Sequence, residues 1–370
     1  MKSYPNREKI RLAILFGGRS PEHTISLVSA REVLARVDRS RYDPVPIGID
    51  RTGTWQFLTE RECSLLFRGE HPQFTRAKRD LSLFDERAFR FSPCTLKRYV
   101  DVLFPLLHGP FGEDGTVQGL ARLADIPCIG SSVLGSALCM DKEVTKRLMQ
   151  AAGISVVPFR CLRRGDDIDP GNRVGELGLP LFVKPANMGS SIGIRKVTRE
   201  DALPTAVAEA LRHDDKVLIE KCIVGREIEC AVLGNRNPEA SVLGEIVTRH
   251  DFYSYEAKYS DPGGTTLSVP ATLPARTGER VRRMALRAFA LAECRGMARV
   301  DFFVTPEGTP LFSEINTVPG FTPISLYPLL WEASGIDYAT LIDRLVTLAM
   351  ENHGDEPEPF KNGRGSENGF

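Results

Sequence analysis

Short apolar runs that alternate with glycine turns and amphipathic segments constrain this chain most strongly, because that alternation is typical of sheets covered by helices. The first run, Leu12–Phe16, ends in Gly17-Gly18 and is followed by apolar positions spaced for a helix over residues 25–37. We expect a strand, a glycine turn and a helix, with Ser20 as its N-cap and Glu22 in its first turn. Further short strand signals predict a small α/β layer with a mostly parallel sheet.

The same kind of pattern divides the chain into three predicted domains. Residues 1–131 form the α/β unit, in which residues 51–99 lack regular patterning and are expected to be a peripheral insertion. Residues 132–223 and 224–351 mix strand and helix signals and are expected to be two α+β units. Residues 352–370 contain almost no aliphatic side chains, so we expect a disordered tail.

Composition excludes several functional classes. The chain has 370 residues, which favours several domains that share a cleft. Lys and Arg number 48, and so do Asp and Glu, so the chain lacks the positive excess that binding to a phosphate backbone requires, and nucleic acid is not an expected partner. No apolar run approaches the ~20 residues that cross a bilayer, and the N-terminal residues lack an apolar signal segment. We therefore expect a cytoplasmic protein with no membrane partner.

Two adjacent predicted strands carry polar side chains at alternate positions. Arg299 and Asp301 lie two residues apart on one strand, and Glu314 and Asn316 lie two apart on the next. Alternation points each pair to one face, so the four polar groups can share a surface. Oxygens of these types suit Mg²⁺. A solvated sheet face is the alternative interpretation. Apolar neighbours such as Val300 argue against it, because they would bury the opposite face of the sheet in a core.

A glycine-rich turn over residues 189–193 joins two predicted strands and can present its N–H groups to phosphate. It matches neither common phosphate-loop motif, and such a turn alone is more often a plain hairpin. Lys184 ends the preceding strand and Lys142 begins a helix, so either side chain can reach phosphate oxygens, although a lone lysine usually faces solvent. Glu220-Lys221 ends an apolar strand before a linker whose backbone can pair with a base edge.

Two loops are further candidates. His108 follows a buried strand and precedes a glycine-rich loop, and the carboxyl end of a strand is where α/β sheets place ligands. A histidine satisfied within a turn is the alternative. Residues 251–261 carry three tyrosines and a lysine with too few aliphatic side chains for a core. We interpret residues 251–264 as a lid.

Taken in order, these segments resemble the ATP-grasp superfamily and, within it, the D-alanine:D-alanine ligase family. The motifs that carry the resemblance are FGGRSPEHTIS, LLHGPFGEDGTVQG, MDK, LPLFVKPANMGSSIG, VLIEKCIVGREIE, FYSYEAKY, MARVDFF and EINTVPGFTPISLYP. They cover nearly the whole chain. Thr24, Phe111 and Ser260 depart from the family pattern, but none of the three is a residue that the chemistry needs.

The resemblance implies a three-domain ATP-grasp fold with an N-terminal parallel-sheet domain and with ATP between two antiparallel-rich sheets. It also implies that ATP phosphorylates the carboxylate of one D-alanine and that the amine of a second D-alanine attacks this acyl phosphate. ATP and two Mg²⁺ ions, for which Mn²⁺ can substitute, are the implied cofactors. The implied product, D-alanyl-D-alanine, would supply peptidoglycan precursor synthesis, and the implied assembly is a homodimer.

The resemblance assigns roles to individual residues. The metal ligands would be Asp301, Glu314 and Asn316. The nucleotide would be held by Lys142, Lys184, Ser191, Glu220, Lys221, Ile223, Glu227 and Phe303. The first D-alanine would meet Glu22, Ser190, Tyr259 and His108, and the carboxylate of the second would meet Lys258, Ser325 and Leu326. Arg299 and the N–H of Gly320 would stabilise the tetrahedral intermediate.

Three alternative functions stay open on the sequence alone. A D-alanine:D-lactate ligase is disfavoured because Lys258-Tyr259 matches the lid of the dipeptide-forming type. A D-alanine:D-serine ligase is harder to exclude, because a small pocket resists one added hydroxyl by only ~10²-fold. A nucleotide-binding regulator without catalysis is disfavoured because Arg299 and all the predicted metal ligands are present.

Overall fold

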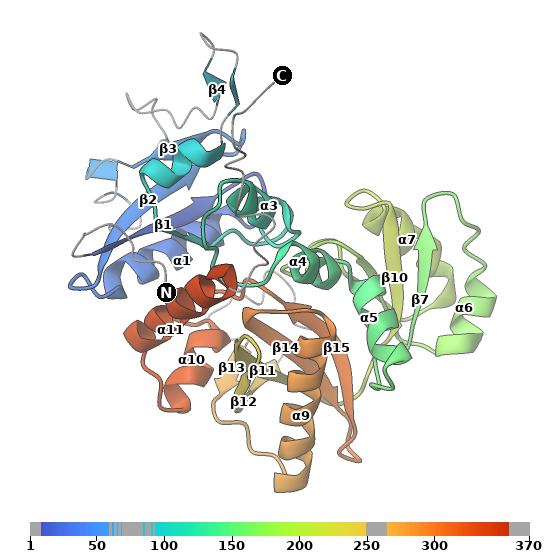
Figure 1. The fold of residues 1–370 in the computed structure, drawn as a ribbon. Coiled ribbons are helices and arrows are strands. Elements are labelled where there is room, and N and C mark those ends of the chain that lie inside the picture. Colours follow the sequence, from blue (N-terminus) through green and yellow to red (C-terminus); the bar gives the residue numbers. More distant parts are fainter. Residues whose placement is uncertain are drawn as a thin grey trace, which may run out of the picture.

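The computed structural model describes residues 9–58, 61–62, 65, 68, 84–85, 90–91, 93–248 and 265–354. Three main sheets organise these residues, and each lies in one of the predicted domains 1–131, 132–223 and 224–351 (Figure 1). The domain boundaries themselves stay predictions. Within the described ranges, no helix has both the length and the apolar character that crossing a membrane requires.

The N-terminal sheet is mainly parallel, with the strand order β3-β2-β1-β6. Its strands are β1 (Ile10–Gly17), β2 (Tyr42–Ile49), β3 (Trp55–Phe57) and β6 (Val102–Pro105). β1 runs parallel to both β2 and β6, and β3 is antiparallel to β2. Alternate residues of β1 face opposite sides, so that Ile14 packs towards α1 (His23–Arg36) and Leu15 towards α3 (Thr116–Leu123). The predicted parallel α/β layer is confirmed.

One local prediction in this unit is wrong. Helix α1 begins at His23, because the Ser20 hydroxyl accepts the N–H of Glu22 in a turn that precedes the helix. Glu22 therefore occupies the N-cap position, and its carboxylate makes no capping hydrogen bond. Residues 127–130 pair with the sheet through one bridge, between Cys128 and Leu103.

The central sheet is antiparallel throughout, in the order β7-β10-β8-β9. Its strands are β7 (Phe159–Arg163), β8 (Leu181–Pro185), β9 (Arg195–Val197) and β10 (Lys216–Lys221). One face packs against α6 (Pro170–Leu177), η2 (Glu200–Ala202) and α7 (Leu203–Ala210). Two helices precede the sheet along the chain, α4 (Val133–Met140) and α5 (Lys142–Ala151). β9 begins at Arg195, after a turn that has left-handed backbone at Ser190 and Ser191, with φ of 47° and 61°.

The C-terminal sheet is also antiparallel, in the order β13-β12-β11-β14-β15. Its strands are β11 (Arg226–Gly234), β12 (Glu239–Thr248), β13 (Thr265–Ser268), β14 (Gly296–Val304) and β15 (Pro310–Asn316). Helix α9 (Ala275–Leu291) packs on the face that carries Val300 and Phe302, which confirms that this face is seated in a core. Two helices, α10 (Leu326–Ala333) and α11 (Tyr338–Gly354), pack on the other side.

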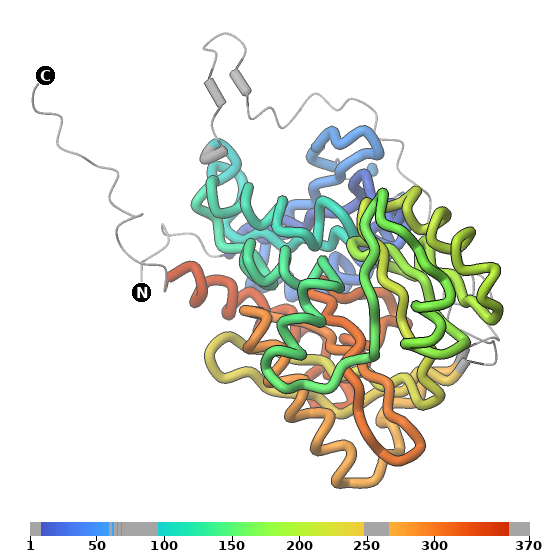
Figure 2. Tube along the Cα trace, turned by 90° about the vertical axis from the view of Figure 1, so that its right-hand side faces the viewer, coloured from blue at the N-terminus to red at the C-terminus, as the bar shows by residue number. Residues whose placement is uncertain are grey.

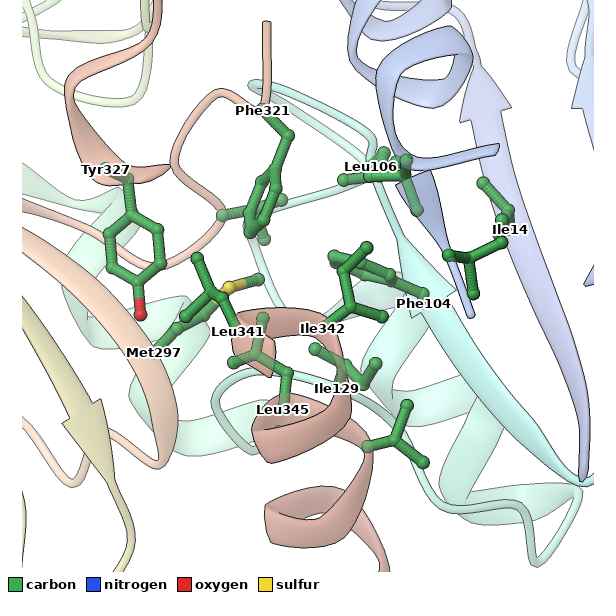
Figure 3. Packing of buried hydrophobic residues seen from close by; sticks show 14 of the residues in the cluster. Ile14, Phe104, Leu106, Ile129, Met297, Phe321, Tyr327, Leu341, Ile342 and Leu345 are labelled. Atoms are coloured by element: carbon green, nitrogen blue, oxygen red, sulfur yellow. The ribbon is translucent and has the colours of Figure 1, made fainter. Parts of the chain in front are cut away.

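A hydrophobic cluster joins the N-terminal and C-terminal units (Figure 3). The ring of Phe321 packs edge-on against Phe104 of β6, with centroids 5.3 Å apart. Ile342 and Leu345 of α11 complete the cluster. Figure 2 shows α11, in red, beside the blue and cyan N-terminal unit. This cluster fixes the loop that contains Phe321 at the junction of the two units.

Several predicted segments lie wholly or partly outside the described residues. In the insertion at 51–99, the structure describes β3, the two-stranded pair β4 (Phe84–Asp85) and β5 (Arg90–Phe91), and η1 (Pro93–Arg98). The lid at 251–264 lies outside the described residues, as does most of the tail at 352–370. Helix α11 continues to Gly354, into the start of that predicted tail, where the imidazole of His353 lies 3.1 Å from Asp125.

Candidate active site

A cavity of about 140 Å³ opens where the three sheets meet. Its walls come from the start of α1, the strand end at β6, the glycine-rich turn after β8, and the neighbouring strands β14 and β15. The predicted site residues that line the cavity are Glu22, His108, Lys142, Ser190, Arg299, Glu314, Asn316, Gly320, Ser325 and Leu326. The structure therefore brings together residues that are distant in sequence.

One wall of the cavity is acidic. The Ser190 hydroxyl donates a hydrogen bond to Oε1 of Glu22, which is 6% exposed. Oε2 of Glu22 is buried and has no hydrogen-bond partner among the described residues. A Cβ at Gly109 or Gly189 would lie 2.5 or 2.6 Å from this oxygen, so only glycine lets both backbones approach it. This wall can receive a small cation.

Glu113 is a second carboxylate of this wall, which the sequence analysis did not single out. Its Oε2 accepts the N–H of Gly109 at 3.1 Å, and its buried Oε1 has no partner among the described residues. Burial, followed by the charge of Glu22, raises the pKa of Glu113 well above its usual value. The only sequence signal was its place in the loop that follows His108.

His108 is held on both sides. Its Nδ1 lies 3.0 Å from the carbonyl of Val318, and its Nε2 lies 3.1 Å from the hydroxyl of Ser29. The Ser29 hydroxyl in turn accepts the N–H of Phe321 at 3.3 Å. Burial lowers the pKa of His108, so the neutral imidazole is favoured. The ring thus ties α1 to the loop after β15 while one edge lines the cavity.

Arg299 supplies the cationic side of the cavity. It forms a bidentate pair with Asp301, both distances 2.8 Å, and its Nε lies 2.8 Å from Glu229. Burial opposes its charge, but Asp301 and Glu229 outweigh burial and raise its pKa well above the usual value. Glu229 was not among the residues predicted from the sequence. Because Glu229 stands opposite Asp301 in the β11–β14 ladder, strand pairing was the signal that would have found it.

The polar residues of β14 and β15 face each other as the alternation predicted. Asp301 is paired with Glu314, and Arg299 with Asn316. A carboxylate oxygen of Glu314 also lies 3.5 Å from Nζ of Lys142. Among the residues that the structure describes, no three His, Cys, Asp or Glu side chains are grouped as a metal site. Two carboxylates and one amide on a shared face nevertheless match the oxygen ligands of Mg²⁺, whose remaining positions are commonly filled by phosphate and water.

Lys142 and Lys184, the two lysines that are predicted to reach phosphate, occupy different surroundings. Lys142 donates to the carbonyl of Met188 at 2.6 Å, beside the glycine-rich turn. Lys184 is 7% exposed and lies 2.8 Å from Oε2 of Glu220, away from the cavity wall. The other oxygen of Glu220 lies 3.0 Å from Lys146, a fully buried lysine that the sequence analysis did not identify. The side chain of Glu220 thus faces two lysines, and its predicted contact with the base stays a prediction.

The other predicted nucleotide residues lie outside the cavity lining. Lys221 ends β10 with an exposed side chain, and Ile223 follows in the linker to β11. Glu227 on β11 stands opposite Phe303 on β14, and Phe303 is half-buried on the polar face of that strand. Ser191 lies beside the cavity turn without lining the cavity. The structure therefore separates these residues from the substrate-side group, and their roles stay predictions.

The N-terminus of α10 closes the far side of the cavity. The Ser325 hydroxyl lies 2.8 Å from the Thr322 hydroxyl and accepts the N–H of Thr322 at 3.0 Å. A Cβ at Gly320 would lie 2.6 Å from the same Ser325 oxygen. Leu326 is the first residue of the helix. The predicted partners Lys258 and Tyr259 lie outside the described residues.

Comparisons with known proteins agree with this arrangement. Residues 11–131 match the D-ala D-ala ligase N-terminus family, and residues 148–347 match the D-ala D-ala ligase C-terminus family. D-alanine–D-alanine ligase A of Escherichia coli (strain K12) is 46% identical over 359 residues, which cover 94% of this chain and 97% of the relative.

Solved structures extend the likeness to the fold. The D-alanine–D-alanine ligase of Coxiella burnetii has a TM-score of 0.81 at 36% identity, with 96% of this chain and 98% of that chain covered. The VanG D-Ala:D-Ser ligase of Enterococcus faecalis has a TM-score of 0.78 at 33% identity, with coverage of 92% and 99%. The Bacillus anthracis D-alanine–D-alanine ligase complexed with ATP has a TM-score of 0.72 at 28% identity, with coverage of 94% and 100%. The chain has the ATP-grasp fold and belongs to the D-alanine–D-alanine ligase family.

Proposed function

We propose that this protein joins two D-alanines at the expense of ATP. A carboxylate oxygen of the first D-alanine attacks the γ-phosphorus, which releases ADP and forms D-alanyl phosphate. The amine nitrogen of the second D-alanine then attacks the acyl carbon, and inorganic phosphate leaves. The observation that carries the proposal is the placement of the unpartnered Oε2 of Glu22 and the cation of Arg299 on walls of one small cavity.

The cavity suits an amino acid whose ammonium meets the acidic wall. Oε2 of Glu22 is buried and lacks a partner among the described residues, and an ammonium supplies the donor that such an oxygen requires. Ser190 orients Glu22 through its hydrogen bond. Arg299 can then face the reacting carboxyl group, where oxygen charge develops in the tetrahedral intermediate.

ATP is proposed to approach from the side of Lys142 and Lys184, with its base near the linker at Lys221 and Ile223. The donor set of Asp301, Glu314 and Asn316 fits two Mg²⁺ ions, with Mn²⁺ as a substitute. When bound, these ions would neutralise phosphate charge. Lys142 already lies against the glycine-rich turn and within 3.5 Å of Glu314, so its charge is available at the phosphate end.

The second D-alanine is proposed to place its carboxylate at Ser325 and at the N–H of Leu326. Helix N-termini stabilise anions through their unpaired N–H groups and the helix dipole. The position is across the cavity from Glu22, so the two substrates would meet near Arg299. Lys258 and Tyr259 are proposed to close this side from the lid.

The cellular part of the proposal follows from the family. The dipeptide would be consumed in peptidoglycan precursor synthesis in the cytoplasm, and the protein is proposed to act as a homodimer. D-serine is the competing second substrate because VanG, a D-Ala:D-Ser ligase, has a similar fold.

The test is ADP release, measured with purified protein, ATP and Mg²⁺ in the presence of D-alanine, D-serine or D-lactate, with the products identified by mass. We expect ADP release that depends on D-alanine and a product with the mass of D-alanyl-D-alanine. Preferential formation of D-alanyl-D-serine from an equimolar mixture would assign the second substrate to D-serine. Nucleotide binding without any D-alanine-dependent turnover would overturn the proposal in favour of a regulator.

A further inference from the structure

Three buried charges meet behind the cavity. Glu220 lies between two lysines, with Oε2 2.8 Å from Lys184 and Oε1 3.0 Å from Lys146. The exposed fractions of these residues are 4% for Glu220, 7% for Lys184 and 0% for Lys146. Lys146 also lies over the ring of Phe159, at 5.8 Å from its centroid. Nothing in the proposed reaction yet uses Lys146.

Local geometry explains why these side chains meet. Lys184 of β8 stands opposite Leu218 of β10, so Glu220 is its diagonal neighbour on the same face of the sheet. Phe159 of β7 stands directly opposite Glu220 on the other side of β10. Lys146 reaches this face from α5, four residues after Lys142, and therefore shares a helix face with that lysine.

Lys184 has two competing partners. In this structure it is paired with Glu220. In the proposed function the same ammonium turns towards phosphate oxygens of the nucleotide. Were Lys184 the only partner of Glu220, that movement would leave a buried carboxylate uncompensated, which is strongly unfavourable.

We propose that Lys146 is a positioning residue for nucleotide binding, which keeps Glu220 paired and in place when Lys184 turns to phosphate. This inference rests on the proposed function. Lys146 stays inside the domain and does not touch substrate. It shifts the equilibrium of Lys184 between Glu220 and phosphate. The Oε1 atom of Glu220 remains paired with Lys146 whether Lys184 contacts Glu220 or phosphate.

The cost of burying Lys146 supports a specific role. Burial lowers its pKa to about 8, and the charge of Glu220 only partly offsets that effect. An apolar side chain of similar length would fill the same space against Phe159 without this cost. Glu220 shows the complementary effect, since burial opposes its charge but the two lysines outweigh burial and lower its pKa.

The first experiment compares ADP with adenosine as ligands of the full-length wild type and of Lys146→Met, by calorimetry or by displacement of a fluorescent nucleotide. Adenosine has no phosphate and does not require Lys184 to leave Glu220. We therefore expect Lys146→Met to weaken ADP binding by ~10-fold or more and adenosine binding by less than ~2-fold. In steady-state assays the KM for ATP should rise while the KM for D-alanine stays unchanged.

Lys216→Met is the matched control. Lys216 of β10 is another buried lysine, paired with Asp141 and Glu143, so its loss removes a buried ion pair without involving Lys184. We expect it to leave the ratio of ADP to adenosine affinity unchanged. Equal weakening of ADP and adenosine by Lys146→Met would mean that Lys146 only supports the fold, and would overturn the inference.

Glu220→Gln keeps the inference testable if Lys146→Met does not fold. With the carboxylate neutralised, Lys184 has no charged partner to leave, so the ratio of ADP to adenosine affinity should be at least that of the wild type, whatever the substitution does to binding of the base. In the double variant, Lys146→Met should then change ADP affinity by less than ~2-fold. Weaker ADP binding by Glu220→Gln with adenosine binding unchanged would overturn the inference. These binding ratios do not depend on turnover, so a failure of ligation alone overturns the proposed function separately.

Discussion

The hydroxyl of Ser190 donates a hydrogen bond to the carboxylate of Glu22, and this contact joins the glycine-rich turn of the central unit to the first helix of the N-terminal unit. The two residues are 168 positions apart in the chain. Since the other oxygen of Glu22 has no partner among the described residues, the hydroxyl fixes the carboxylate while leaving one oxygen available to a ligand.

Ser190→Ala should therefore weaken use of the first D-alanine. A hydrogen bond to a charged group contributes ~1.5–3 kcal/mol, so we expect kcat/KM for D-alanine to fall by ~10–100-fold with little change in nucleotide binding. The measurement is initial rate against D-alanine concentration at saturating ATP. Ser40→Ala is the control, because Ser40 makes an exposed hydrogen bond to Asp38 far from the cavity. Equal kinetics for both variants would contradict the assignment of the acidic wall.

Glu314→Gln should abolish ligation. The change removes charge beside Lys142 and opposite Asp301, at the place where Mg²⁺ is proposed to meet phosphate. Weak ATP binding should survive. Turnover is measured over a titration of Mg²⁺, with Glu307→Gln at the exposed β14–β15 turn as control. Near wild-type turnover of Glu314→Gln at saturating Mg²⁺ would show that the metal assignment is wrong.

Local patterns predicted the parts of this fold that depend on neighbouring residues. Alternation along β14 and β15 correctly predicted that Asp301 and Glu314 face one surface, because a strand repeats every two residues. Local sequence patterns cannot predict which segments that are distant in the chain come into contact. Glu229 and Lys146 were missed because their roles arise from strand pairing and from docking of α5, respectively. The start of α1 was misplaced because the turn before it engages the Ser20 hydroxyl.

Glu113→Gln should stabilise the protein, and more so as the pH rises. The folded protein holds the carboxyl of Glu113 with a raised pKa, so above about pH 4.5 the unfolded chain loses this proton while the folded protein retains it. Stability is therefore lost as the pH rises towards the folded pKa, and glutamine removes that loss. We expect the Tm difference from wild type to be near zero at pH 4 and to be positive at pH 8. Glu332→Gln on the exposed side of α10 is the control, and a pH-independent difference would contradict the prediction.

Phe104→Ala should lower the free energy of unfolding by about 3–5 kcal/mol, as removal of a buried aromatic ring usually does. Phe104 is fully buried and packs edge-on against Phe321 between the N-terminal and C-terminal units. Phe111→Ala, at a side chain that is 48% exposed, should cost less than ~1 kcal/mol. Thermal and denaturant unfolding of both variants give the comparison, and similar losses would mean that the cluster does not join the units energetically.

The most direct test of the proposed reaction follows a carboxylate oxygen of D-alanine into the products. Wild-type protein is incubated with ATP, Mg²⁺ and D-alanine labelled with ¹⁸O in both carboxyl oxygens, and the dipeptide and inorganic phosphate are analysed by mass spectrometry. If the carboxylate attacks the γ-phosphorus and the amine then displaces phosphate, each dipeptide formed leaves one ¹⁸O atom in the released phosphate. Dipeptide accompanied by unlabelled phosphate, or ADP release without dipeptide, would contradict the account.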